Sequence, residues 1–260
     1  MTLNLSAPTS WSELSQQQLT FLLKTIVTVQ QENNCLPFSS KEDFSTQIFA
    51  QVALRCLFHW NNISIVTPYN QSWIISHNGS QYTVSPADIA PALSVMQWIS
   101  QAPDIPVRLD VIDGAQALPP DIEDDISFDD FLACEACWQV WQSSQSDEIL
   151  REMAAILYRK KEISLQPFEY LSIFYWWAAL KNLFAFRYPD FFQPDPNNSA
   201  PIPPDPLSLR RNMDAQIRAL TKGDITKEST ILALPAARAL TELNALAKEF
   251  DQINRKFNSK

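Results

Sequence analysis

The sequence contains little glycine, histidine or cysteine, and each scarcity excludes a class of site. Its 260 residues include three glycines, two histidines and four cysteines. Three scattered glycines cannot form the glycine-rich loops that hold phosphate groups or dinucleotides. Two histidines are too few for a three-histidine zinc site, and the H-E-x-x-H motif is absent. We therefore expect no catalytic residue, no cofactor and no bound metal.

Long apolar runs are also missing. In the most hydrophobic window, the stretch between the charged Glu169 and Lys181 is about half of the ~20 residues that a membrane-spanning helix needs. We expect a core helix there and no membrane span. The segment Met1–Ser10 has neither the basic nor the apolar region of a secretion signal. The four cysteines are then expected to be reduced thiols of a cytoplasmic protein.

Acidic residues exceed basic ones by 29 to 20, which gives a net charge of −9. A chain of this charge is repelled by phosphate backbones, which argues against nucleic-acid binding. The charge is unevenly placed, because residues 207–260 carry ten basic and six acidic side chains. The sequence thus predicts an acidic body followed by a mildly basic end.

Helical periodicity dominates what is present. Ser10 and Glu13 have capping-box spacing, and apolar residues then recur every three or four positions. The β signal is confined to residues 63–85, where Asn78-Gly79 favours a type I′ turn. We predict a mainly α protein, α+β only through a small β-hairpin or meander, with several helices in its body.

One segment is rich in proline. Six prolines between Pro194 and Pro206 predict an extended linker. We expect a helical body over 1–192 with the hairpin near 63–85, a proline-rich linker over 193–206 and an amphipathic helical tail over 207–260. The last helix has apolar residues at heptad-like spacing, so it could form a coiled coil or a hairpin that docks on a partner or on the body. These residues are Ala236, Leu240, Leu243, Ala247, Phe250 and Phe257.

Two polar patterns have a structural and a functional interpretation. Cys134 and Cys137 have C-x-x-C spacing inside a predicted helix, without a second pair of ligands, which favours two core thiols over a zinc site. Nine carboxylates between Asp110 and Glu135 could hold Ca²⁺ or Mg²⁺, although no EF-hand pattern is present. A solvated acidic loop is favoured. The alternative function is an enzyme or ligand-binding protein that uses region 110–135 for a divalent metal.

The remaining candidates for chemistry point away from nucleophilic catalysis. His59 and His77 are the only histidines, and neither accompanies a G-x-S-x-G elbow. Eleven aromatic residues lie within 168–192, a density that suits either a core or an interface. We assign Phe174, Trp177 and Phe184 to the core. The partner-binding candidates are Phe191, Phe192, Leu240, Leu243, Ala247 and Phe250.

Short strings along the chain carry a family resemblance. They are W-S-E-L at 11–14 with Gln18-Leu19, F-Y-W at 174–176 with Lys181, and tail strings at 212–213, 216–221, 223–228 and 238–243. With them the chain resembles uncharacterised proteins of tailed phages and prophages of gut bacteria, some grouped with tail-assembly or tail-assembly-chaperone genes. The resemblance implies a cytoplasmic, non-enzymatic, chaperone-like protein that binds another phage structural or assembly protein. Homo-oligomerisation stays open.

Overall fold

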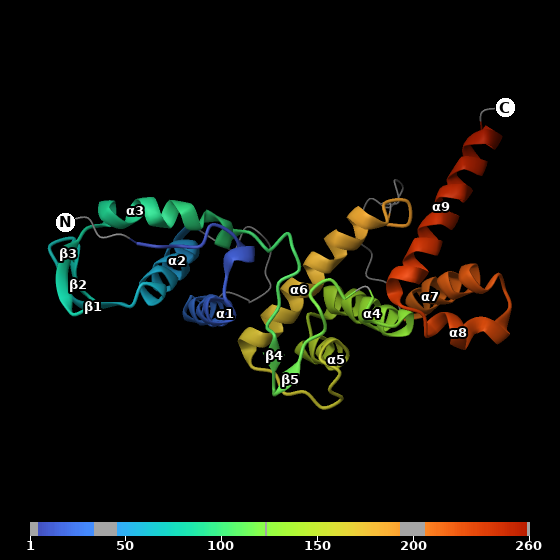
Figure 1. The fold of residues 1–260 in the computed structure, drawn as a ribbon, viewed down its shortest axis with the longest axis horizontal. Coiled ribbons are helices and arrows are strands. Elements are labelled where there is room, and N and C mark those ends of the chain that lie inside the picture. The colour runs from blue at the N-terminus through green and yellow to red at the C-terminus, as the bar shows by residue number, and fades with distance from the viewer. Residues whose placement is uncertain (1–4, 34–45, 123, 193–205, 259–260) are drawn as a thin grey trace. The chain divides into compact units, whose positions relative to one another are not determined.

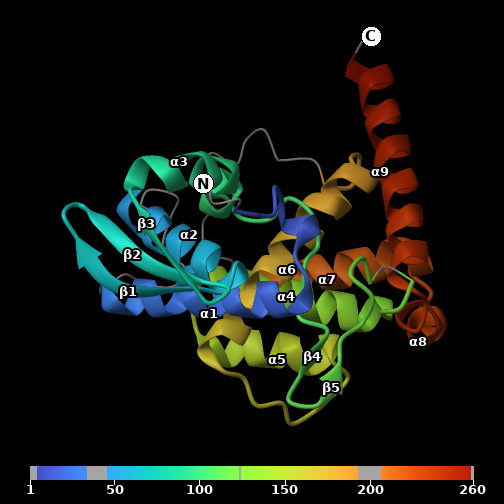
Figure 2. The ribbon, with the colours of Figure 1, turned by 60° about the vertical axis from the view of Figure 1, so that its left-hand side comes forward.

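The fold is mainly α, as predicted. A computed structural model describes residues 5–33, 46–122, 124–192 and 206–258, which form helices with one three-stranded and one two-stranded antiparallel sheet. Contacts divide the chain into two units (Figures 1 and 2). Unit 1 comprises 1–109 and 166–175, and unit 2 comprises 110–165 and 176–260. Helix α6 (Pro167–Arg187) contributes residues to both.

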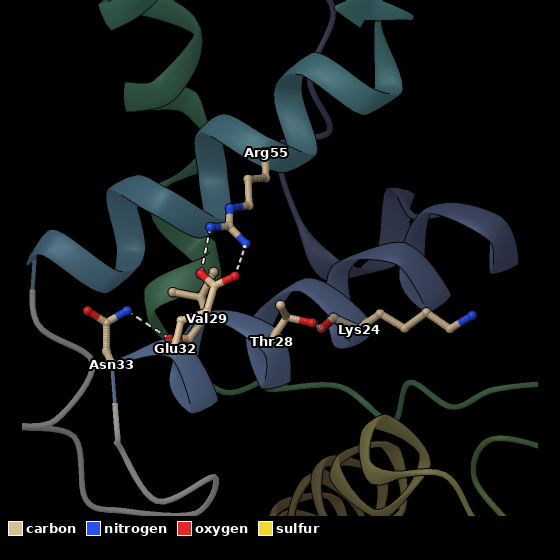
Figure 3. Close-up of polar contacts among 6 residues, drawn as sticks. All are labelled: Lys24, Thr28, Val29, Glu32, Asn33 and Arg55. Atoms are coloured by element: carbon tan, nitrogen blue, oxygen red, sulfur yellow. Dashed lines mark hydrogen bonds and ion pairs between the residues drawn. The ribbon is translucent and has the colours of Figure 1, made fainter. Parts of the chain in front are cut away.

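In unit 1, helices α1 (Gln16–Glu32) and α2 (Thr46–Trp60) pack against each other. A capping box at Ser15 and Gln18 begins α1, since each side chain accepts the other's backbone N–H. Glu32 and Arg55 point toward each other from the two helices in Figure 3, with guanidinium-to-carboxylate distances of 3.2 and 2.6 Å. This bidentate pair links α1 to α2 at the surface, above a core that includes Leu22, Ile26, Val52 and Leu57.

Two tryptophans of unit 1, Trp11 and Trp98, pack against each other. A 3₁₀ turn, η1 (Trp11–Glu13), places the Trp11 ring edge-on to Trp98, with centroids 5.1 Å apart. Trp98 lies in a second 3₁₀ turn, η2 (Met96–Ser100), which follows α3 (Pro86–Val95). Each indole N–H donates to a backbone carbonyl, Trp11 to Gln101 and Trp98 to Pro8. Because both indoles are satisfied, burying them costs no unpaired donor.

The predicted hairpin region is a three-stranded meander of β1 (Ile63–Tyr69), β2 (Ser72–His77) and β3 (Ser80–Val84). Asn78 and Gly79 both have positive φ, 49° and 78°, as a primed turn requires. One face carries Ile75 and Val84 and packs on Phe58 of α2 and Ile89 of α3. Strand β1 has a bulge between Ile65 and Thr67, and its residues after Ile63 are exposed.

Unit 2 is built around the C-terminal part of α6. Helices α4 (Phe128–Ser144) and α5 (Asp147–Leu157) pack together, and the short hairpin of β4 (Val111–Ile112) and β5 (Ala115–Gln116) precedes them. Phe131 of α4 lies 6.2 Å from Trp177 and 5.5 Å from Phe184 between ring centroids. Trp177 and Phe184 are fully buried, as predicted, whereas Phe174 is only half-buried. The prediction for Phe174 is wrong because a helix that is apolar on all sides does not reveal which face is covered.

The last helices belong to unit 2. They are α7 (Pro206–Thr221), the 3₁₀ turn η3 (Ile225–Lys227), α8 (Glu228–Leu232) and α9 (Ala236–Asn258). Around α4, the Phe128 N–H donates to the Leu234 carbonyl (2.8 Å), and the Ala236 N–H donates to the Ile126 carbonyl (2.9 Å). These bonds hold the start of α9 against the start of α4.

The boundaries of units 1 and 2 differ from those of the body, linker and tail expected from the sequence. Residues 193–205 of the expected linker lie outside the described residues. The separate folding of a body 1–192 and a tail 207–260 stays a prediction. Among the helices that the structure describes, none combines the length and the apolar character needed to cross a bilayer.

Candidate interaction surface

Helix α9 has one apolar face along most of its length. Its apolar residues form two interleaved series, each with alternating steps of four and three, the spacing that aligns side chains on one side of a helix. They are Ala236, Ala239, Leu240, Leu243, Leu246, Ala247, Phe250 and Ile253.

The first half of this face is covered by the chain itself. Ala236, Ala239, Leu240 and Leu243 are buried, and α9 contacts both α4 and α7. The sequence placed Leu240 and Leu243 on a partner-binding surface. In the structure they belong to the core of unit 2, since a side chain enclosed by its own unit is not available to a partner.

The second half of the face is uncovered. Phe250 is 64% exposed and Ile253 is 52% exposed, while Leu246 and Ala247 are half-buried. We call these four residues the distal stripe. Figures 1 and 2 both show this half of α9 extending beyond α7 and α8. Because these two large apolar side chains continue the buried face of the same helix, we take the distal stripe as the candidate interaction surface.

Two members of the distal stripe were not among the sequence candidates. Ala247 and Phe250 were named, and the structure places both on this stripe. Leu246 and Ile253 were missed, although each lies three residues after a heptad position that had been identified, Leu243 and Phe250. They belong to a second series with the same spacing, Leu243, Leu246, Phe250 and Ile253, which shares two residues with the first series and runs along the same side of the helix.

The other sequence candidates, Phe191 and Phe192, lie where α6 ends. The Asn244 side chain of α9 accepts the backbone N–H groups of Asp190 (2.9 Å) and Phe191 (3.0 Å). The rings of Phe191 and Phe192 pack edge to face with centroids 4.9 Å apart, and both residues are half-buried. This pair therefore braces the end of α6 against α9 and leaves only part of its surface for a partner.

The Lys181 side chain contacts the ring of Phe192. The Lys181 ammonium is 5.5 Å from the Phe192 ring centroid and 2.6 Å from a carboxylate oxygen of Glu135 on α4. Both charged side chains are largely covered, and the second oxygen of Glu135 is buried without a hydrogen bond. The ion pair joins α4 to α6, and Lys181 also contacts Phe192 after the end of α6. The most exposed aromatic residue of α6, Phe186, is 84% exposed and was not a sequence candidate.

In the acidic region 110–135, Asp113 forms an ion pair with Lys160. Asp113 accepts from the Lys160 ammonium (2.6 Å) and from the Ser164 N–H (3.0 Å), and these bonds lower the pKa of its carboxyl group. Among the described residues, no three His, Cys, Asp or Glu side chains lie together as metal ligands would. Use of region 110–135 for a divalent metal stays a prediction.

The C-x-x-C pair lies within α4, as predicted. Burial raises the pKa of Cys134 well above its ordinary value, and burial together with the Glu152 carboxylate raises that of Cys137 to about 11. Burial likewise raises the pKa of Cys56 to about 12. Protonated thiols are poor nucleophiles and poor metal ligands. Cys56 and Cys134 are buried, as small apolar core groups are, whereas Cys137 is half-buried and its thiol donates to a Glu152 carboxylate oxygen (3.8 Å).

Both histidines have structural contacts. His59 stacks on Phe21 with ring centroids 3.6 Å apart. Nδ1 of His77 lies 2.9 Å from the Asn61 carbonyl oxygen, so Nδ1 carries the proton and donates. Neither contact arranges a base beside a nucleophile.

A cleft that could hold a small molecule lies in unit 2, beside α5, with a volume of about 470 Å³. Its lining mixes both charges, including Asp113, Glu148, Arg151 and Glu152. These groups already have partners, since Arg151 pairs with Glu148 and Asp113 pairs with Lys160. The charged groups of the cleft are thus partly engaged in ion pairs within the chain.

Comparison with protein-family models, with curated proteins and with solved structures found no match to this chain.

Proposed function

We propose that this chain is a non-catalytic interaction protein that binds another structural protein through the distal stripe. The observation that supports this is the change along α9: one continuous apolar face is covered by α4 and α7 up to Leu243 and is exposed at Phe250 and Ile253. A helix or groove of a partner protein would bury the exposed side chains of Phe250 and Ile253.

The chemistry of the stripe suits such docking. Aromatic residues, phenylalanine among them, are enriched in the buried centre of protein interfaces. Full burial of Phe250 and Ile253 would contribute about 1.5–3 kcal/mol each. Helix α9 is joined to α4 by backbone hydrogen bonds and to the end of α6 by Asn244, so its base is fixed when a partner arrives. A fixed helix loses less conformational freedom on binding.

The class of partner comes from the resemblance. The strings at 11–14, 174–176 and along 212–243 resemble phage and prophage proteins associated with tail assembly. We propose that the chain belongs to a phage or phage-derived element and assists tail assembly, in a chaperone-like manner, by covering part of another structural protein in the host cytoplasm. An acidic surface and the distal stripe are compatible with that role.

The test is affinity purification of the tagged full-length chain from its native host, with co-eluting proteins identified by mass spectrometry. We expect one phage structural protein in stoichiometric amount. A variant with Phe250→Asp and Ile253→Asp should lose that protein, because two carboxylates on the stripe cannot be buried without a partner charge.

A matched control keeps the experiment specific. Ala245 is exposed on the opposite side of α9, so Ala245→Asp adds the same charged group away from the stripe. This variant should retain the partner. Recovery of the wild-type chain alone would contradict the proposed function, and retention of the partner by the Phe250/Ile253 variant would show that docking uses another surface.

A further inference from the structure

Charged residues lie beside the distal stripe at defined heptad positions. With Phe250 at position a and Ile253 at position d, Glu249 and Lys256 both occupy position g. Both residues are exposed. The other flanking position, e, holds the uncharged Asn254. One flank of the stripe therefore carries a negative and a positive charge, one heptad apart, and the other flank is neutral.

This pattern is self-complementary in one orientation. When two helices pair antiparallel, position a of one faces position d of the other, and the g positions face each other. If Phe250 packs on Ile253 of a second copy, Glu249 faces Lys256 of that copy. The two-fold symmetry then gives the same pair again on the other helix. Both charged positions meet an opposite charge.

The alternatives lack this complementarity. In a parallel pair, position g faces position e, so Glu249 would face the neutral Asn254. Sliding the antiparallel pair by one heptad toward the start of α9 would set Glu249 against Glu249 of the second copy. Charge therefore selects the antiparallel orientation. It does not select the register by itself, because the shifted pair would also set Glu242, a third g position, against Lys256. The register follows from burial, since the shifted pair would need Leu243, which is buried within unit 2.

The burial of the first half of α9 within unit 2 agrees with this register. The antiparallel pair uses the helix from Leu246 onward, where the apolar side chains change from half-buried at Leu246 to exposed at Phe250 and Ile253. The two Leu240 positions would lie about 35 Å apart along the helix axis, at 1.5 Å per residue. The two copies of unit 2 thus attach at opposite ends of the pair.

We propose that a second copy of this chain occupies the distal stripe, with the two α9 helices antiparallel about a two-fold axis between Phe250 and Ile253. The inference rests on the proposed function, since the same stripe serves both: self-pairing covers it until the structural partner replaces the second copy. The contact is short, so the dimer is weak and exchangeable, with a Kd on the order of 10 µM.

Sedimentation velocity of the purified full-length chain tests the pairing. Between about 1 and about 200 µM, the wild type should shift from monomer to dimer. The variant with Phe250→Asp and Ile253→Asp should remain a monomer throughout, while Ala245→Asp should dimerise like the wild type. Far-ultraviolet circular dichroism and thermal unfolding establish that each variant is folded. A wild type that stays monomeric at about 200 µM overturns the proposal.

Charge reversal tests the register. Glu249→Lys alone and Lys256→Glu alone each place like charges at both flanking contacts, so each should raise the Kd about tenfold. An equimolar mixture of the two variants restores opposite charges at both contacts and should dimerise like the wild type. Arg255→Glu makes the same change of charge at position f, on the far side of the helix, and should leave the Kd unchanged.

The outcomes separate this inference from the proposed function. A mixture that pairs no better than its components overturns the antiparallel register. These measurements use the purified chain alone, so a monomeric wild type contradicts self-pairing and leaves partner capture from the host to be judged separately. Conversely, a chain that dimerises but captures no phage structural protein contradicts the proposed function and keeps the pairing.

Discussion

Helices α6 and α9 are the two longest of the described residues, and they satisfy their apolar side chains in different ways. The part of α6 in unit 2 is apolar on several sides and is enclosed, with Trp176, Trp177 and Phe184 fully buried. Helix α9 is apolar on one face only, and that face is enclosed in its first half and exposed in its second. A helix apolar on all sides has to lie in a core, whereas an amphipathic helix can leave part of its face for another molecule.

The largest expected effect tests the enclosed helix. Trp177→Ala should lower the free energy of unfolding by about 3–5 kcal/mol, because it leaves a cavity beside Phe131 and Phe184. Urea unfolding followed by circular dichroism measures it. Phe186→Ala, on the same helix but 84% exposed, should change the free energy by less than about 0.5 kcal/mol. Equal losses at the two positions would contradict the described packing of α6.

A second comparison tests the two halves of α9. Leu240→Ala should lower the free energy of unfolding by about 2–5 kcal/mol, since Leu240 is fully buried. Phe250→Ala should change it by less than about 0.5 kcal/mol in urea unfolding at about 1 µM, where self-pairing does not contribute. If Leu240→Ala costs as little as Phe250→Ala, the first half of α9 does not pack within unit 2.

The smallest effect concerns the ion pair that joins α6 to α4. Lys181→Met should lower the free energy of unfolding by about 1–2 kcal/mol, a value reduced for the partial exposure of the pair, because Glu135 then keeps a largely covered charge without its cation. Replacing both residues by leucine should recover most of that loss, since no charge is left to desolvate. Urea unfolding compares the variants. A double variant less stable than Lys181→Met would mean that the pair contributes by itself.

Local signals in the sequence were sufficient for several elements. The Asn78-Gly79 turn and the flanking β-branched residues identified the meander, because a primed turn depends on those two residues alone. The first helix shows the limit of such signals. Ser10 and Glu13 have capping-box spacing but begin only the 3₁₀ turn η1, and the helix begins after the capping box at Ser15. Two adjacent start signals cannot be ranked without the packing of Trp11 on Trp98.

The candidate surface could be predicted only in part. Heptad spacing located the apolar face of α9, but the sequence did not reveal where its cover ends. That limit is set by α4 and α7, which precede α9 in the chain and contact it. Hydrogen bonds at Ile126 and Leu234 hold the start of α4 against the start of α9. Leu240 and Phe250 look equivalent in the sequence for this reason. Asn244, which fixes the end of α6, gave no signal, because a single asparagine has no pattern.

Strand β1 has a consequence for how the protein withstands high concentration. It forms an edge of its sheet, and Ile65, Val66 and Tyr69 on it are about half exposed, a combination that invites fibril-like stacking of one copy on another. Pro68 has no N–H to donate, and the bulge at Ile65–Thr67 breaks the regular spacing of donors and acceptors. A strand of a second copy would not find a regular series of hydrogen-bond donors and acceptors along β1. The exposed apolar residues of this edge therefore favour aggregation less than they would on a regular strand.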